Sequence, residues 1–258
     1  MFKAVIPARY ASTRLPGKPL LDIGGKPMVV RVAERALRSG ADEVVVATDH
    51  EDIAKACKQH GLDVLMTRND WPTGTDRIAE VAQKMGWTAQ TVVVNVQGDE
   101  PLIDPGLVDL VANTLLHGEQ HIATCAHPIT DWSEFKNPNV VKIALREDGE
   151  ALYFSRAPIP YPRDHFALEQ WPANAPTRHL GLRHIGLYAY KVEFLNRYQT
   201  LAPAPVEQLE SLEQLRALAN GFRIKVCMIQ DAPLPGVDTA EDLEKVRALF
   251  QSTATQGQ

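Results

Sequence analysis

Residues 43–66 read EVVVATDHEDIAKACKQHGLDVLM and give the clearest indication of the fold. It opens with a Val-rich run at 43–48, which predicts a buried β-strand. The amphipathic residues 49–60 predict a helix that ends at Gly61, and residues 62–66 predict the next strand. A strand, a helix and a second strand in this order indicate a parallel βαβ unit.

The same alternation continues on both sides of this unit. We expect strands at 2–7 and 91–96 and helices at 27–39, 76–85 and 104–116. The pattern predicts an α/β fold, a Rossmann-like and mostly parallel sheet with helices on both faces. Ligands of such sheets bind beyond the carboxyl ends of the strands, so we expect the loops 7–19 and 97–101 at the site.

The second half of the chain is less regular. The expected strands are 122–127, 140–145, 151–155, 182–190 and 223–229, and the expected helices are 206–220 and 239–250. A Pro-rich loop is expected at 157–177. We expect one domain over 1–258. It divides into a first half, 1–120, a β-rich extension, 121–235, and a closing segment, 236–258.

Composition excludes several classes of function. The chain has 258 residues, 45% of them apolar, and a net charge of −5, which disfavours binding to nucleic acid. Three scattered cysteines without a CxxC motif indicate a reducing compartment and small core residues rather than disulfides or zinc ligands. Because no signal peptide and no long apolar run is seen, we expect a cytoplasmic protein without a membrane segment.

The loop 7–20, PARYASTRLPGKPL, follows the first strand and is rich in cationic and hydroxyl side chains. They are Arg9, Arg14, Lys18, Ser12 and Thr13. Such groups at the end of a strand suit the phosphates of a nucleotide. The loop is neither a Walker A motif nor GxGxxG, and a solvated basic loop is the alternative interpretation.

Seven sequence blocks in a fixed order resemble the KDO cytidylyltransferase (CMP-KDO synthetase) family, where KDO is 3-deoxy-D-manno-octulosonate. They are PARYASTRLPGKPLLDIGGKP (7–27), TGTDR (73–77), VNVQGDEP (94–101), YFSRAPIPY (153–161), HIGLYAY (184–190), LEQLR (212–216) and GVDTAEDL (236–243). These blocks span nearly the whole chain. The wider nucleotidyltransferase superfamily carries a looser form of the first block.

The resemblance implies a transferase that moves CMP from CTP to the anomeric hydroxyl of KDO. The products are CMP-KDO and pyrophosphate, and the reaction activates KDO for lipopolysaccharide synthesis. It also implies a homodimer, a Mg²⁺ cofactor, and catalytic roles for Arg9, Lys18 and Asp99.

Two acidic residues fit the expected Mg²⁺ site. The resemblance makes Asp99 and Asp238 the ligands, and Mg²⁺ favours one or two carboxylates completed by substrate phosphates and water. From local sequence alone, Asp99 also fits a turn before Pro101. Asp238 also fits a helix cap, as does Thr239 with Asp242.

The nucleotide is expected against the first loop and two later blocks. The implied residues are Pro7, Ala8, Arg9, Ser12, Thr13, Arg14, Lys18, Thr73, Asp76, Arg77, Gln97 and Gly98. Gly98 lets the backbone approach a ligand closely. Asp76 and Arg77 alone also fit the start of a surface helix.

For the sugar, the resemblance implies Gln97, Arg156, His184, Tyr188, Glu213 and Gln214. Arg156 suits a carboxylate through its bidentate fork. Strand alternation puts His184 and Tyr188 on one face of a strand. The alternatives are core packing for these two rings and an ordinary helix surface for Glu213 and Gln214.

Other functions stay open at this stage. A cytidylyltransferase for 8-amino-KDO or a sialic acid is the nearest alternative, and a uridylyl- or guanylyltransferase is more distant. A nucleotide-binding protein without catalysis is disfavoured because Lys18, Asp99 and Asp238 are all present. The histidines at 50, 60, 117, 121 and 165 show no ligand spacing and receive no role.

Overall fold

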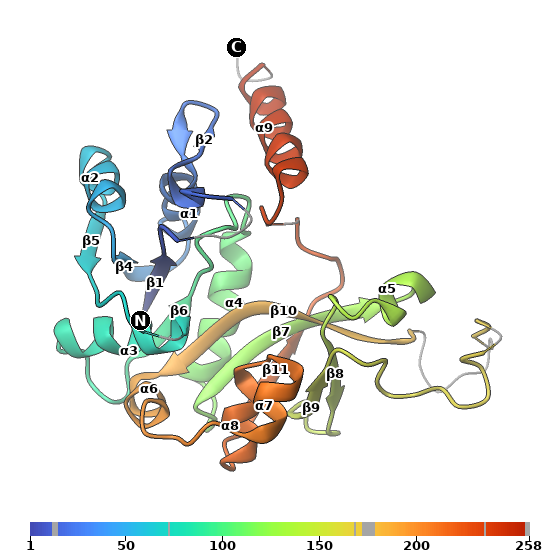
Figure 1. The fold of residues 1–258 in the computed structure, drawn as a ribbon. Helices are drawn as coiled ribbons and strands as arrows, with labels where there is room; N and C mark the ends of the chain where they lie inside the picture. The colour runs from blue at the N-terminus through green and yellow to red at the C-terminus, as the bar shows by residue number, and fades with distance from the viewer. Residues whose placement is uncertain (12–14, 72, 168, 172–178, 235, 256–258) are drawn as a thin grey trace.

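In the computed structural model, residues 1–11, 15–71, 73–167, 169–171, 179–234 and 236–255 are described, the last four of them by their backbone only. A nine-stranded sheet forms the centre of the described chain (Figure 1). Its strands are β1 (Phe2–Ala8), β4 (Ala41–Thr48), β5 (Asp63–Met66), β6 (Val92–Asn95), β7 (Ile122–Ile129), β8 (Lys142–Leu145), β9 (Ala151–Ser155), β10 (Gly181–Lys191) and β11 (Ile224–Met228).

The strand order is β11-β7-β10-β6-β1-β4-β5, and β8 and β9 extend the sheet from β10. Strand β1 runs parallel to β4 and β6, β4 to β5, and β7 to β11. Strand β10 is antiparallel to β6 and β7, which makes the sheet mixed but mostly parallel. The prediction of a Rossmann-like α/β fold is confirmed.

Helices cover both faces of the sheet. They are α1 (Met28–Ala36), α2 (Glu51–Gln59), α3 (Gly74–Lys84), α4 (Pro105–Leu116), α5 (Trp132–Lys136), α6 (Val192–Tyr198), α7 (Pro205–Glu210), α8 (Gln214–Ala219) and α9 (Ala240–Thr255). A buried apolar cluster joins α1, α2 and α4 to one face, and a second joins α3, α6 and α8 to the other. Burial of these apolar side chains on both faces is the main source of stability for such a layered fold.

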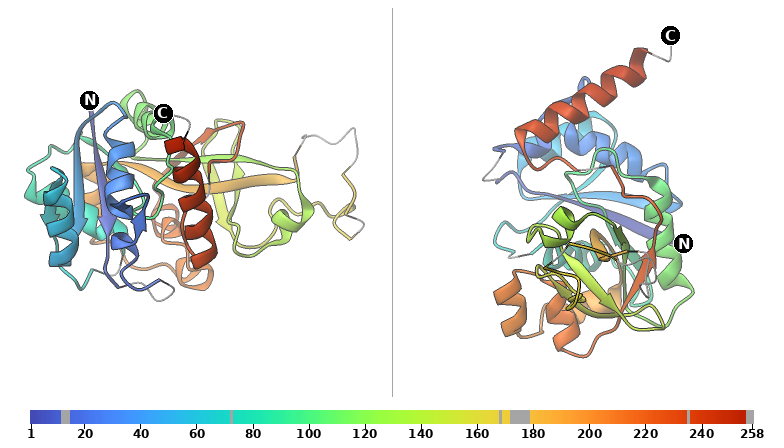
Figure 2. Two further views of the ribbon diagram at one scale, coloured as in Figure 1. Left: turned by 90° about the horizontal axis from the view of Figure 1, so that it is seen from above. Right: turned by 90° about the vertical axis from the view of Figure 1, so that its right-hand side faces the viewer.

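Short elements complete the first half. A 3₁₀ turn, η1 (Lys18–Leu20), follows the opening loop, and strands β2 (Asp22–Ile23) and β3 (Lys26–Pro27) form a small hairpin. The closing helix α9 packs on this region through Ile23, Met28, Leu243 and Val246 (Figures 1 and 2). Helix α9 thereby lies beside the hairpin of β2 and β3.

The second half extends from one side of the sheet. Figure 1 shows β8, β9 and α5 there, with the loop that follows β9 reaching furthest out. A separate apolar cluster stabilises this extension around Phe135 and Leu180, against which Trp132, Phe166 and Trp171 pack. The predicted Pro-rich loop is a loop in its described part, 157–167 and 169–171.

One predicted helix, 206–220, is wrong in detail, since the structure divides it into α7 and α8. Ser211 lies between them with a φ of 52°, which a continuing helix does not allow. Arg216 Nη2 then lies 2.6 Å from Glu207 Oε1, an ion pair that joins the two short helices. Helices α5 and α6 are additional to those predicted.

No helix in the described part of the chain is both long and apolar enough to cross a bilayer. The three cysteines are free and buried, as predicted for core residues.

Candidate functional site

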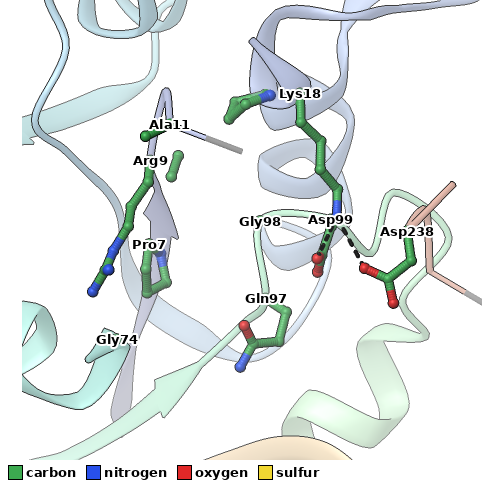
Figure 3. Close-up of a pocket in the computed structure, with 11 residues that line it drawn as sticks. Pro7, Arg9, Ala11, Lys18, Gly74, Gln97, Gly98, Asp99 and Asp238 are labelled. Carbon is green, nitrogen blue, oxygen red and sulfur yellow. Dashed lines mark hydrogen bonds and ion pairs between the residues drawn. The ribbon is translucent and has the colours of Figure 1, made fainter. Parts of the chain in front are cut away.

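A cavity of about 430 Å³ lies at the carboxyl ends of β1 and β6 (Figure 3). Parallel sheets bind ligands at this edge, and the sequence analysis expects the site there. The residues that line the cavity are Pro7, Ala8, Arg9, Ala11, Lys18, Pro19, Gly74, Gln97, Gly98, Asp99 and Asp238. They come from four separate parts of the sequence.

The floor of the cavity depends on close packing of two backbones. Val96 N donates to Val5 O over 2.9 Å, so the loop after β6 continues the pairing with β1. A Cβ atom on Gly98 would lie only 2.5 Å from the carbonyl oxygen of Pro7. Only glycine fits at this position, and its close approach is to the Pro7 backbone.

Lys18 lies between two carboxylates at one end of the cavity (Figure 3). Its Nζ is 2.7 Å from Asp99 Oδ2 and 3.3 Å from Asp238 Oδ1. The Lys18 side chain is 13% exposed, whereas the two carboxylates keep more contact with solvent. Residues separated by up to 220 positions therefore meet at one charged centre.

The alternative of a helix cap for Asp238 is resolved by its neighbours. Thr239 N and Oγ1 both donate to Asp242 Oδ2, and Asp242 N donates back to Thr239 Oγ1. This reciprocal pair is the capping box of α9. The Asp238 carboxylate is therefore not needed as a cap and faces Lys18.

The acidic pair has the chemistry of a Mg²⁺ site. Both residues offer carboxylate oxygen, and both lie within ion-pair distance of one cationic nitrogen. A small divalent cation bound by Asp99 and Asp238, with phosphates and water as further ligands, fits this donor set. The described residues contain no cluster of three or more metal-binding side chains.

Glu100 lies behind this pair. Its burial and the nearby charges of Asp99 and Asp238 raise the pKa of its carboxyl group to about 7. It lines a second cavity, of about 320 Å³, together with His127, Arg183 and His184.

Arg9 forms the opposite wall of the first cavity, and its guanidinium points away from Lys18 (Figure 3). Burial, followed by the nearby charge of Arg77, lowers the pKa of Arg9. Its buried Nη2 has no hydrogen-bond partner among the described residues. A buried donor of this kind is costly to leave unpaired, so it marks a place for an anionic or polar ligand.

The block at 73–77 begins helix α3, and only part of it lines the cavity. Thr73 caps the helix by accepting from Asp76 N, and Gly74 lines the cavity. A helix N-terminus favours negative charge, so this wall suits a phosphate or a hydroxyl group. The structure brings Gly74, but not its neighbours Asp76 and Arg77, into the lining.

Arg77 is fully buried. Its Nη2 lies 2.8 Å from Asp49 Oδ2, and its Nη1 donates to Thr67 Oγ1. Asp76 is also buried, and its Oδ2 accepts from Thr73 Oγ1 over 2.7 Å. In this arrangement both side chains support the wall from behind, and contact of either with a nucleotide stays a prediction.

Three predicted residues, Ser12, Thr13 and Arg14, lie outside the described residues. Sequence reasoning missed Ala11, Pro19 and Gly74, which line the cavity. All three lie inside the recognised blocks. Their small or apolar side chains gave no chemical signal.

The predicted sugar residues Tyr188, Glu213 and Gln214 lie together around a narrow cavity with Thr75 and Tyr190. The rings of His184 and Tyr188 are 5.2 Å apart, so the two side chains share one face of β10, as strand alternation predicts. A bulge in the pairing of β10 with β7 lies between them, at 185–188.

Burial dominates the electrostatics of this group. It lowers the pKa of His184 to about 3 and raises the pKa values of Tyr188 and Glu213. Gln214 Nε2 is buried and, within the chain as described, makes no hydrogen bond, whereas the buried Tyr188 hydroxyl has Thr124 as a partner. The cavity between them has a volume of about 10 Å³, which is room for about one water molecule.

Gln97 connects the two regions, since it lines the first cavity and its Nε2 donates to Gly186 O over 3.3 Å. Arg156 lies elsewhere. Its Nε donates to Glu210 O over 2.7 Å and its Nη1 to Pro138 O over 3.0 Å. Because it lines none of the three cavities described above, binding of a sugar carboxylate by Arg156 would need this segment to move.

Comparison with known proteins gives two kinds of similarity. The profile of the cytidylyltransferase family matches residues 3–226. A solved structure of CMP:2-keto-3-deoxy-manno-octonic acid synthetase in complex with CTP is 43% identical in sequence and has a TM-score of 0.87. The match covers 98% of this chain and 100% of that one.

A cytidylyltransferase from Leptospira borgpetersenii serovar Hardjo-bovis (strain JB197) is more distant. It is 19% identical with a TM-score of 0.62, and the match covers 97% of this chain and 87% of that one. At this level of identity the likeness concerns the fold alone.

Proposed function

The chain belongs to the cytidylyltransferase family, and from this premise we propose that it transfers CMP from CTP to the anomeric hydroxyl of KDO. The products are CMP-KDO and pyrophosphate, which makes the reaction a step that activates KDO for lipopolysaccharide synthesis. The observation that carries the proposal is the convergence of Lys18, Asp99 and Asp238 at the cavity beyond β1 and β6.

The choice of sugar has two supports. The synthetase with 43% identity over nearly the whole chain is named for 2-keto-3-deoxy-manno-octonic acid, which is KDO. The second is that His184 and Tyr188, two residues that the family blocks assign to the sugar, share one face of β10 with ring centroids 5.2 Å apart.

Catalysis in this proposal rests on positioning and charge. Transfer of a nucleotidyl group needs little covalent chemistry from the protein, so the chain has to align the hydroxyl with the α-phosphorus and stabilise negative charge. Lys18 is the cation nearest the acidic pair and would stabilise charge on the transferred phosphate. Arg9 would hold a further anionic group with its unpaired Nη2.

Asp99 and Asp238 would hold Mg²⁺. When bound, the ion would neutralise phosphate charge and lower the pKa of the attacking hydroxyl. Asp99 also serves as the candidate acceptor for the hydroxyl proton, because its carboxylate lies at the cavity with 37% of its side chain exposed.

The carboxylate of KDO is attached to the carbon that bears the reacting hydroxyl, so its partner has to lie close to the acidic pair. Arg9 lines that cavity, and Arg156 does not. Because the Arg9 guanidinium forms the opposite wall and points away from Lys18, we propose that Arg9 receives a group of the nucleotide rather than this carboxylate.

The experiment is a pyrophosphate-release assay with CTP and Mg²⁺ and three acidic sugars in parallel. KDO should give the highest kcat/KM, above 8-amino-KDO and N-acetylneuraminate. Higher turnover of either competitor would assign another sugar. CTP binding without release from any of the three would make the protein a non-catalytic nucleotide binder.

We also propose a cytoplasmic homodimer. The extension exposes several large apolar side chains, among them Leu152, Tyr161 and Leu209, which an interface with a second copy would cover. Three free cysteines suit a reducing compartment. Light scattering on the purified chain tests the proposal, and a mass of 28.5 kDa at micromolar concentration would contradict a dimer.

A further inference from the structure

An aromatic pair lies next to the nucleotide cavity without lining it. The rings of Tyr10 and His50 are stacked, with centroids 3.9 Å apart and an angle of 13° between their planes. Tyr10 is 40% exposed, and neither ring belongs to the lining residues. Their contact therefore needs an explanation other than the hydrophobic core or direct contact with the cavity.

Tyr10 connects both ends of the opening loop. It directly follows Arg9, and its ring packs against Gly17, where a Cβ atom would lie 3.6 Å from Tyr10 Cε2. Gly17 has a φ of 65° and begins the turn η1 that carries Lys18. Tyr10 is thus bonded to Arg9 in the chain, and its ring contacts Gly17, the residue before Lys18.

His50 belongs to the rigid part of the fold. Its Nδ1 accepts from Asp52 N over 3.3 Å and caps helix α2, and its backbone N donates to Thr48 Oγ1 over 3.2 Å. Helix α2 packs on the sheet through Ile53 and Cys57, and it also contacts η1. The imidazole is therefore a fixed platform beside a loop.

We infer that Tyr10 and His50 are positioning residues, whose stack fixes the opening loop so that Arg9 and Lys18 meet the triphosphate of CTP. The inference rests on the proposed function for the identity of the ligand. Holding cationic side chains in place before the ligand arrives lowers the entropy lost on binding, so removal of the stack should weaken CTP binding.

The test uses variants that separate stacking from capping. Tyr10→Ala removes the ring, while Tyr10→Phe keeps it and loses only the hydroxyl. His50→Asn removes the imidazole but keeps a residue that caps helices well. His60→Asn, at the exposed other end of α2, is the matched control.

Tyr10→Ala and His50→Asn should each raise the KM for CTP and its dissociation constant about three- to ten-fold, the range for loss of one aromatic pair. The KM for KDO should stay within two-fold. Tyr10→Phe and His60→Asn should behave like the wild type. Loss of folded protein lowers the apparent kcat and leaves both KM values unchanged, so a selective effect on CTP separates positioning from stability.

The double variant Tyr10→Ala with His50→Asn should bind CTP about as weakly as either single variant, because both remove the same contact. Strictly additive losses, or single variants with wild-type affinity for CTP, would overturn the inference. Calorimetry measures CTP binding without sugar. If the wild type binds CTP but releases no pyrophosphate, the proposed function fails while the positioning role is still decided by these affinities.

Discussion

Val237 N donates to Asp99 O over 2.8 Å, and this backbone bond joins the two loops that carry the acidic pair. Val237 is fully buried in the apolar cluster under α9, so the loop before α9 is held from both sides. The fold itself therefore holds together the two loops that carry Asp99 and Asp238.

Asp99→Asn should abolish Mg²⁺-dependent pyrophosphate release at ordinary Mg²⁺ concentrations. The substitution keeps the shape of the side chain but removes the charge that binds the ion. A Mg²⁺ titration of the rate measures the effect, with CTP binding in EDTA as a second readout that should not weaken. Full activity at ordinary Mg²⁺ would remove Asp99 from the metal site.

Asp242→Ala is the matched control for the acidic pair. It removes the acceptor for Thr239 N and Oγ1, so α9 should lose about 0.5–2 kcal/mol of stability. The Mg²⁺ concentration that gives half-maximal rate should stay unchanged, because Asp238 rather than Asp242 faces Lys18. An equal loss of Mg²⁺ dependence in this variant would argue that the whole loop, and not the Asp238 carboxylate, is responsible.

Lys18→Ala should lower kcat by about 10²–10³-fold, the usual effect of removing one charge-stabilising donor from a transition state. The melting temperature should change little. Although Lys18 is 13% exposed, its partners Asp99 and Asp238 are 37% and 68% exposed and regain water. Single-turnover kinetics measure the step, and an unchanged kcat would refute the role of Lys18 on the phosphate.

Gly98→Ala should destabilise the protein by about 1–3 kcal/mol, as overpacking usually does. The new Cβ atom meets the Pro7 carbonyl at 2.5 Å, so the loop after β6 has to move away from β1. Gly74→Ala is the control for stability, because nothing lies within 4 Å of a Cβ atom there. Urea unfolding measures the stability of both variants. Equal stability of the two would mean that the loop after β6 moves away from Pro7 without cost.

Much of the fold can be predicted from the sequence because apolar periodicity reports burial directly. The Val-rich strands β4 and β6 and the helices between them lie where the pattern indicates. The break at Ser211 could not be predicted in this way. The positive φ of Ser211 and the ion pair between Arg216 and Glu207 that joins the two helices carry no periodic signal.

The candidate site divides along the same lines. Lys18, Asp99 and Asp238 carry charges inside recognisable blocks, and the structure brings them together. Arg156 is suited to bind a carboxylate, but its guanidinium donates to the backbone carbonyls of Glu210 and Pro138 instead. His50 received no role from its spacing, because a stack with Tyr10 depends on two loops that only the folded chain brings together.

His184 should make the stability of the protein sensitive to acid. Burial lowers its pKa from 6.5 to about 3, so between these values the unfolded chain binds a proton that the folded chain does not. Stability from this group is complete above pH 6.5 and falls as the pH decreases toward 3. The expected slope is about 1.4 kcal/mol per pH unit at most.

Urea unfolding at pH 7.5 and pH 5.0 measures this effect in the wild type and in His184→Asn. The wild type should lose about 2 kcal/mol between the two pH values from this residue. His184→Asn should be less stable at pH 7.5, since it loses the contact of Nε2 with Thr124 Oγ1 at 3.1 Å, and should show a smaller pH dependence. His117→Asn, which changes an exposed histidine, should keep the wild-type dependence. If His184→Asn and the wild type lose equal stability on acidification, His184 is protonated in the folded protein at pH 5.0, and water in the second cavity, which His184 lines, reaches its ring.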